Sequence, residues 1–230
     1  MTGNFSWWIN LQESFLDKKR RAANILSVFK KEYFGAWTTL NYETPFQLLI
    51  ATILSAQCTD ERINKITPSL FLKYPDAKSL SRAKISDIEP IIFSSGFYHS
   101  KAKNIICASK KIMQDFNGKV PDTMEGLISL AGVARKTANI ILFHAYDKNE
   151  GIAVDTHCMR ISHRLGFTSS FSNQNKIEKE LMALINKSDW GAYTNWMVLH
   201  GRKYCFAKNP KCRICPLKNL CQKVGVEKKK

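Results

Sequence analysis

Four cysteines near the end of the chain have the spacing of a metal site. They are arranged as C-x6-C-x2-C-x5-C and are Cys205, Cys212, Cys215 and Cys221. Four thiolates suit either a tetrahedral zinc ion or an iron–sulfur cluster. A zinc ribbon usually pairs two C-x2-C units, whereas this segment has one. The unequal spacers therefore favour a four-iron cluster, and the alternative of reduced structural cysteines fits poorly with so polar a segment.

A lysine after a glycine-containing turn is the first candidate for covalent chemistry. Lys136 lies within residues 130–138, which end one predicted helix and open another. The helix dipole disfavours a cation in the first turn, and a lysine held partly neutral there can act as a nucleophile. From this pattern alone, an ordinary surface lysine is the simpler alternative.

Asp155 is the second candidate for a catalytic group. It follows the apolar residues 152–154 and directly precedes a predicted helix, which is the position of an N-cap. A cap also fixes the carboxylate in space. A carboxylate held in this way can stabilise positive charge that develops on a substrate, or accept and pass on protons.

The turn before Lys136 is a candidate phosphate-binding element. A tight turn between two helices exposes backbone N–H groups at a helix N-terminus, where they bind anions without reading sequence. An ordinary helix–helix loop would have a similar pattern. We expect phosphate contacts from four consecutive residues of the turn: Gly132, Val133, Ala134 and Arg135.

The charge of the chain indicates a polyanionic partner. Its 230 residues include 35 Lys and Arg against 19 Asp and Glu, a formal charge of +16. Nucleic acid is the first candidate partner, ahead of an anionic membrane surface and of a surface that is merely solubilising. Lys208 and Lys211 lie in the short loop between the first two clustered cysteines, with Arg213 just beyond it. A loop fixed by metal ligands would present these charges rigidly to phosphates.

The elements that must position these residues are helices. Apolar residues recur at helical spacing nearly everywhere, and no strand-like alternation is sustained. The sequence therefore predicts an all-α protein of about ten helices joined by short loops. The expected ranges are 15–29, 45–54, 60–73, 84–94, 100–116, 122–130, 135–146, 156–165, 174–186 and 190–203.

The cysteines and the lack of recognisable sorting segments indicate the kind of compartment in which the protein works. No run approaches the ~20 apolar residues of a membrane span, and the first ten residues do not resemble a secretory signal. Four of the seven cysteines crowd into the last thirty residues, which suits a metal site in a reducing compartment. The other three, Cys58, Cys107 and Cys158, are expected to pack within helices and to bind no metal.

Both ends of the chain differ in composition from the middle. The first sixteen residues contain Trp7 and Trp8 and few charges, so we expect an arm that packs on the body. Residues 228–230 are three lysines and are expected to form a solvated tail.

Taken together, the motifs resemble one family. Residues 130–138, then 154–157, then the four-cysteine loop occur in the order and spacing of the endonuclease III family of helix-hairpin-helix DNA glycosylases. Residues 55–60 and 96–102 are also similar to that family. The resemblance covers roughly residues 40–221, and its three main motifs together are highly specific.

The resemblance implies a two-lobed all-α fold with a DNA-binding cleft between the lobes. One lobe would be a continuous helical barrel over residues 38–148 that carries the helix-hairpin-helix. Residues 1–37 and 149–230 would form the other, discontinuous lobe. By the same resemblance, the loop at 205–221 would hold a [4Fe–4S] cluster, with the four clustered cysteines as its ligands.

The resemblance also implies a bifunctional base excision repair enzyme. It would remove oxidised pyrimidines from duplex DNA as a glycosylase and then nick the strand as an apurinic/apyrimidinic lyase. Lys136 would be the Schiff-base nucleophile, and Asp155 the catalytic carboxylate. Gln57 and Phe97 would fill or wedge the gap left by a flipped nucleotide. The implied partner is double-stranded DNA with oxidised pyrimidines or abasic sites, and we expect a cytoplasmic, nucleoid-associated monomer that binds no membrane.

The chain departs from the family pattern at the hairpin and at the wedge. Ala131 and Ala134 stand where the family usually has proline and glycine, and Phe97 where it often has leucine. Alanine stiffens the turn less than proline and reaches positive φ less easily than glycine, so the phosphate grip is expected to be weaker or re-aimed. Two alternative functions are a monofunctional adenine glycosylase, which lacks a lysine at this position, and a catalytically silent DNA-binding protein.

Overall fold

The structure is a computed structural model that describes residues 13–226, and it is all helical, with no strand in that range. This confirms the predicted fold class. The predicted arm with Trp7 and Trp8 and the lysine tail at 228–230 lie outside the described residues. Among residues 13–226, no helix combines the length and apolar content needed to cross a bilayer.

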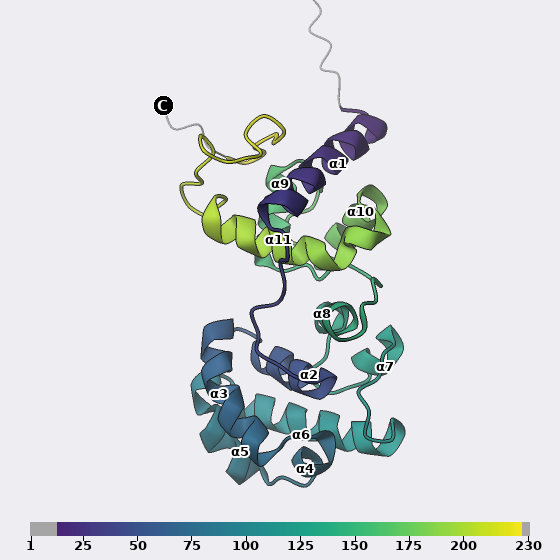
Figure 1. Ribbon diagram of the computed structural model, residues 1–230, viewed down its shortest axis with the longest axis vertical. Helices are drawn as coiled ribbons and strands as arrows, with labels where there is room; N and C mark the ends of the chain where they lie inside the picture. The colour runs from purple at the N-terminus through teal and green to yellow at the C-terminus, as the bar shows by residue number, and fades with distance from the viewer. Residues whose placement is uncertain (1–12, 227–230) are drawn as a thin grey trace, which may run out of the picture.

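The helices follow one another with short connections (Figure 1). In chain order they are α1 (Phe15–Glu32), α2 (Pro45–Leu54), α3 (Asp60–Lys73), α4 (Ala77–Ser81), α5 (Ile85–Ile92), the 3-10 turn η1 (Phe93–Ser95), α6 (Tyr98–Asp115), α7 (Met124–Ile128), α8 (Arg135–Tyr146), α9 (Thr156–Arg164), α10 (Gln174–Leu184), η2 (Lys187–Asp189) and α11 (Trp190–Lys203).

Each predicted helix is present, but several helix ends differ from the prediction and one helix was not predicted. The range 122–130 contains a helix only over Met124–Ile128, and the range 174–186 ends at Leu184. Helix α4 was not predicted, because its five residues are too few to show a helical period. Its start is fixed by Asp76, whose side chain accepts the N–H of Ser79 at 2.8 Å in a capping box.

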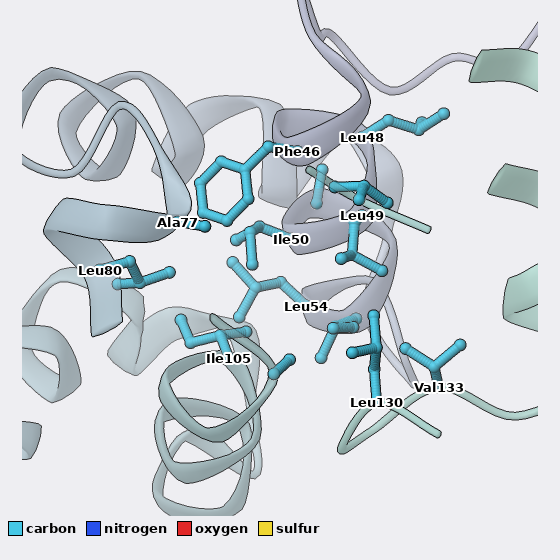
Figure 2. Close-up of a cluster of buried hydrophobic side chains, with 14 of the residues drawn as sticks. Phe46, Leu48, Leu49, Ile50, Leu54, Ala77, Leu80, Ile105, Leu130 and Val133 are labelled. Carbon is cyan, nitrogen blue, oxygen red and sulfur yellow. The ribbon is translucent and has the colours of Figure 1, made fainter. Parts of the chain in front are cut away.

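One hydrophobic core is built around α2. All the residues of α2 from Leu48 to Leu54 are buried, as expected of a helix that is apolar on every side. Figure 2 shows Ile50 and Leu54 of this helix beside Leu80 of α4 and Ile105 of α6, with Leu130 and Val133 at one end. The members of this core come from residues 40–142.

A second core joins the two ends of the described chain. It contains buried residues from 22–33 and from 152–217, and Phe29 of α1 and Tyr193 of α11 are fully enclosed in it. Helices α1, α9, α10 and α11 are grouped in one half of the molecule, and α8 contacts both α2 and α11 (Figure 1). The predicted lobe limits at 38 and 148 lie between the two sets of core residues and stay a prediction.

Candidate functional site

A cleft of about 230 Å³ contains both candidate catalytic residues. It is lined by residues of the first core region such as Thr52, and of the second such as Thr194. Lys136 reaches it from the start of α8, and Asp155 from the segment before α9. The cleft therefore brings together an amine and a carboxylate that lie nineteen positions apart in the sequence.

Lys136 is the second residue of α8 and is exposed. The N-cap of α8 is Ala134, whose side chain makes no capping hydrogen bond. The amides of the first turn are therefore left without the side-chain partner that an Asp, Ser or Thr cap supplies. This helix start, which faces solvent beside the lysine, has the arrangement expected for binding an anion.

The turn before α8 is held tightly against the first core. Val133 is buried, and its N–H donates to the carbonyl of Leu130 at 3.2 Å. Gly132 has φ +80°, and a Cβ on it would lie 3.1 Å from atoms of Asn104 and 3.2 Å from Ile53. The turn thus needs glycine at this position both for its backbone conformation and for the close approach. The side chain of Val133 is buried in the first core, and its N–H is used within the turn.

Arg135 has a partner inside the protein. Its Nε donates to Glu178 Oε2 at 2.7 Å, and the Glu178 side chain is only 7% exposed. The pairing neutralises the charge that the sequence assigned to the hairpin surface. Lys136 therefore stands beside an ion pair instead of beside a free cation.

Asp155 is the N-cap of α9, as the sequence predicts, and its Oδ1 accepts the N–H of Cys158 at 2.6 Å. The segment before it is also held by side chains. Thr194 Oγ1 donates to the carbonyl of Ala153 at 2.9 Å, and Gln174 Nε2 donates to that of Val154 at 3.0 Å. The carboxylate is consequently fixed in position at the cleft wall.

Gln57 and Phe97 lie on two exposed loops and not in the cleft lining. Both have left-handed backbone, with φ 53° at Gln57 and 49° at Phe97, a conformation that costs free energy for residues other than glycine. Phe97 is 67% exposed. Below it, Lys101 is buried and donates from Nζ to the carbonyl of Ser95 at 2.7 Å. A large apolar side chain held out on a strained loop has the form of a group that inserts into a partner.

The four clustered cysteines surround a small cavity together with Arg164 and His200. All four are free thiols. Arg164 Nη1 donates to Cys205 Sγ at 3.3 Å, and the N–H of Lys223 donates to Cys221 Sγ at 3.3 Å. Burial raises the pKa of Cys215 to about 11, and burial likewise raises the pKa of Cys221. Among residues 13–226, no three His, Cys, Asp or Glu side chains converge on one ion site.

Lys208 and Lys211, the two lysines of this loop that were predicted to contact phosphate, are exposed. The ammonium of Lys211 lies 5.2 Å from the centre of the Phe206 ring. Both lie away from the cleft lining, so any contact they make with a ligand is separate from the one at Lys136.

Of the cysteines expected to pack in helices, Cys107 lies on α6 and Cys158 on α9, but Cys58 does not lie in a helix. Cys58 follows α2 in the bend before α3 and lines the cleft. The helical pattern of α2 ends at Leu54, and the polar residues after it carry no apolar period that could have located Cys58.

Several cleft residues had no signal in the sequence. Trp37 is half exposed and lies edge-on to His144, with ring centres 4.5 Å apart. Burial lowers the pKa of His144 to about 4, so this imidazole is neutral at pH 7. Asn195 on α11 faces the same ring, with Nδ2 3.5 Å from His144 Nε2. Each comes from a different segment, and no local motif connects them.

Comparison with known proteins places the chain in a family. Residues 50–187 match the family described as HhH-GPD superfamily base excision DNA repair protein. The chain is 50% identical over 212 residues to endonuclease III of Synechocystis sp., covering 92% of this chain and 96% of the relative. It is 40% identical over 183 residues to endonuclease III of Bacillus subtilis, covering 80% of this chain and 83% of the relative.

The fold is also similar to that of a solved protein–DNA complex. The structure of a trapped endonuclease III–DNA covalent intermediate, an estranged-adenine complex, superimposes with a TM-score of 0.84 at 38% identity. The match covers 89% of this chain and 96% of that one.

Proposed function

Because the chain belongs to the HhH-GPD superfamily of base excision DNA repair proteins, we propose that it is a bifunctional DNA glycosylase and apurinic/apyrimidinic lyase. The observation that carries this function is the shared cleft of Lys136 and Asp155. A similar protein forms a trapped covalent intermediate with DNA, and such an intermediate requires a nucleophile on the protein. Lys136 is an exposed amine in the cleft and can serve as that nucleophile. We further propose oxidised pyrimidines in duplex DNA as the substrate class.

The chemistry begins with extrusion of the damaged nucleotide. A base leaves the stack at a cost of a few kcal/mol, which is smaller for a weakened pair. Phe97, exposed on its loop, offsets that cost by stacking in the gap, and Gln57 on its own loop fills the space that the flipped nucleotide leaves. The amides of Gly132, Ala134 and the first turn of α8 hold phosphate of the same strand.

The amine of Lys136 then attacks C1′ of the sugar. The C1′–N bond to the base breaks, and the base leaves with its electron pair. The nitrogen of Lys136 loses a proton, and its electron pair then breaks the C1′–O4′ bond, so that O4′ takes up a proton and an iminium ion forms at C1′. The iminium acidifies the C2′ hydrogen, and loss of that proton expels the 3′ phosphate by β-elimination. Asp155, at the cleft wall, stabilises the positive charge on the sugar and moves protons. Water as nucleophile would stop after base release.

The loop at 205–221 is proposed to hold a [4Fe–4S] cluster. The donor set fits, because two of the four sulfurs already accept hydrogen bonds, from Arg164 and from the Lys223 amide, as thiolate ligands do. The four sulfurs line one small cavity, and four cysteine thiolates are the ligand set of such a cluster. When bound, the cluster supplies structural cross-linking of the loop that presents Lys208 and Lys211.

Replacing Cys212 with serine is expected to remove the brown colour and the broad visible absorbance of the purified protein, because one cluster ligand is lost. Iron content, acid-labile sulfide and the visible spectrum measure the effect. Cys107→Ser is the matched control, since Cys107 is an exposed free thiol outside the loop, and it should keep the colour. A colourless wild-type protein containing zinc would contradict the iron–sulfur assignment.

Replacing Lys208 with alanine is expected to flatten the salt dependence of duplex binding. Each phosphate contact contributes about −0.9 to the slope of log affinity against log salt concentration, so the slope should fall in magnitude by about one. Lys78→Ala on α4 is the control, because α4 lies at the opposite end of the molecule from this loop (Figure 1). Equal slopes for wild type and Lys208→Ala would remove this residue from the DNA interface.

The activity and its lesion class are tested with a panel of duplex oligonucleotides. Each carries one oxidised pyrimidine, one oxidised purine, an adenine mispair or an abasic site, and base release is scored separately from strand cleavage. We expect release and cleavage with oxidised pyrimidines, and cleavage at the abasic site. Binding without either reaction would identify a silent DNA-binding protein, and adenine release without nicking a monofunctional glycosylase. The proposed setting for this activity is a cytoplasmic, nucleoid-associated monomer.

A further inference from the structure

Glu178 is a buried carboxylate that lies behind the cleft lining and is hydrogen-bonded to the lining residue Asn139. It lies on α10 and is 6% exposed. Both of its oxygens are occupied by donors: Oε2 accepts Arg135 Nε at 2.7 Å, and Oε1 accepts Asn139 Nδ2 at 2.9 Å and the N–H of Ile152 at 3.2 Å. A buried carboxylate is stable only with such compensation, so these three contacts are strongly constrained.

The three donors come from the two elements that carry the reacting groups. Arg135 directly precedes Lys136, and Asn139 lies one turn further along α8, three residues after Lys136. Ile152 begins the segment that leads into Asp155. One carboxylate therefore connects the helix of the nucleophile to the segment of the catalytic carboxylate.

The approach of the chain at this point is very close. A Cβ on Gly151 would overlap Glu178 Oε1 and would lie 2.8 Å from the amide atoms of Asn139. The backbone at residue 151 is thus pressed against the Glu178–Asn139 contact with no room for a side chain. Movement of either element would have to break these hydrogen bonds.

The Arg135–Glu178 ion pair connects the protein interior to the surface beside Lys136. Arg135 is 45% exposed at its side chain and Glu178 7%, so the pair extends from the interior to the surface beside Lys136. The same α10 carries Gln174, which holds the carbonyl of Val154. Helix α10, which itself contributes no residue to the cleft lining, thereby holds the segment of Asp155 at two points and α8 at two.

We propose that Glu178 is a positioning residue for the glycosylase/lyase reaction: its carboxylate sets the placement of Lys136 relative to Asp155 through Arg135, Asn139 and Ile152. This inference rests on the proposed function. It also assigns Arg135 to the support of the nucleophile and not to a phosphate contact. Because reacting groups must be held in a productive geometry, a misplacement of about 1 Å can slow the chemical step on the order of 100-fold.

The test separates chemistry from binding and from stability. Glu178→Gln keeps the size of the side chain but loses the negative charge, and it places an N–H₂ or a neutral oxygen toward Arg135. The single-turnover rate of borohydride-trappable adduct formation on abasic duplex is measured, together with the Kd for a duplex with a non-reactive abasic analogue and the Tm. We expect trapping to slow on the order of 100-fold while Kd changes little.

Glu180→Gln on the same helix is the matched control. Glu180 accepts hydrogen bonds from Ser169 and not from any cleft residue, so its replacement should leave the trapping rate unchanged. If Glu178→Gln does not fold, Arg135→Lys is used, because it keeps the positive charge but loses the Nε–H donated to Glu178. Arg135→Lys should also slow the trapping step while the Kd for the non-reactive duplex changes little.

Two outcomes contradict different claims. A wild type that traps, together with a folded Glu178→Gln or Arg135→Lys that traps at the same rate below its Tm, would overturn the positioning role, since a merely structural residue lowers only the Tm. A wild type that does not trap at all would instead contradict the proposed function.

Discussion

Replacing Lys136 with glutamine is expected to abolish covalent trapping and strand cleavage at abasic sites. The nitrogen electron pair of the glutamine amide is delocalised into its carbonyl and does not attack C1′, and water in its place cannot form an iminium. Loss of a nucleophile reduces the chemical step by up to the order of 10⁶-fold. The side chain is exposed at the start of α8 and is not part of either core, so we expect folding and duplex binding to be retained.

The control for this change is Lys110→Gln, at an exposed lysine of α6, which should trap like wild type. Gel shift of the borohydride-reduced complex is the measurement, with binding to a non-reactive abasic duplex followed in parallel. Undiminished trapping by Lys136→Gln would refute the assignment of the nucleophile.

Replacing Asp155 with asparagine separates the chemical role of this residue from its structural one. Asparagine caps a helix about as well as aspartate, so the bond to the N–H of Cys158 is kept and Tm should change little. The negative charge opposite the developing positive charge is lost, and with it proton transfer worth about 10²- to 10⁴-fold. Single-turnover base release from a duplex with one oxidised pyrimidine should fall by that factor.

Two further variants make this result interpretable. Asp155→Ala loses the cap as well, so it should lower the stability by about 1 kcal/mol in addition to the rate. Asp76→Asn changes the N-cap of α4 in the same way, outside the cleft, and should leave base release unchanged. Full activity of Asp155→Asn would show that the residue is a cap and nothing more.

The helical architecture was predictable because hydrophobic periodicity and capping residues are local features of the sequence. Pro45 after Thr44, whose side chain caps α2 by accepting the N–H of Gln47, marks a helix start in the sequence itself. The exception was α4, where tertiary packing of Ala77 and Leu80 stabilises a helix too short to have a period. Asp155 has a local signal of the same kind as Thr44, because an acidic residue between an apolar run and a helical period is typical of an N-cap.

The candidate site was predictable only in part. Lys136 was marked by its turn, and Asp155 by its cap, but the pairing of Arg135 with Glu178 joins residues 43 positions apart and has no local signature. For the same reason the sequence did not show that Arg135, which was expected to contact phosphate, is paired with a buried carboxylate. Trp37 and His144 meet in the cleft through the packing of distant segments, which periodicity does not encode.

The most direct test of the proposed chemistry is to identify the atom that becomes bonded to DNA. Wild-type protein is reduced with borohydride on a duplex with one abasic site, the complex is digested with protease and nuclease, and the modified peptide is sequenced by mass spectrometry. We predict a single sugar adduct on Nζ of Lys136. An adduct on another lysine or on the N-terminal amine, or cleavage with no adduct, would contradict the assignment of Lys136 as the nucleophile.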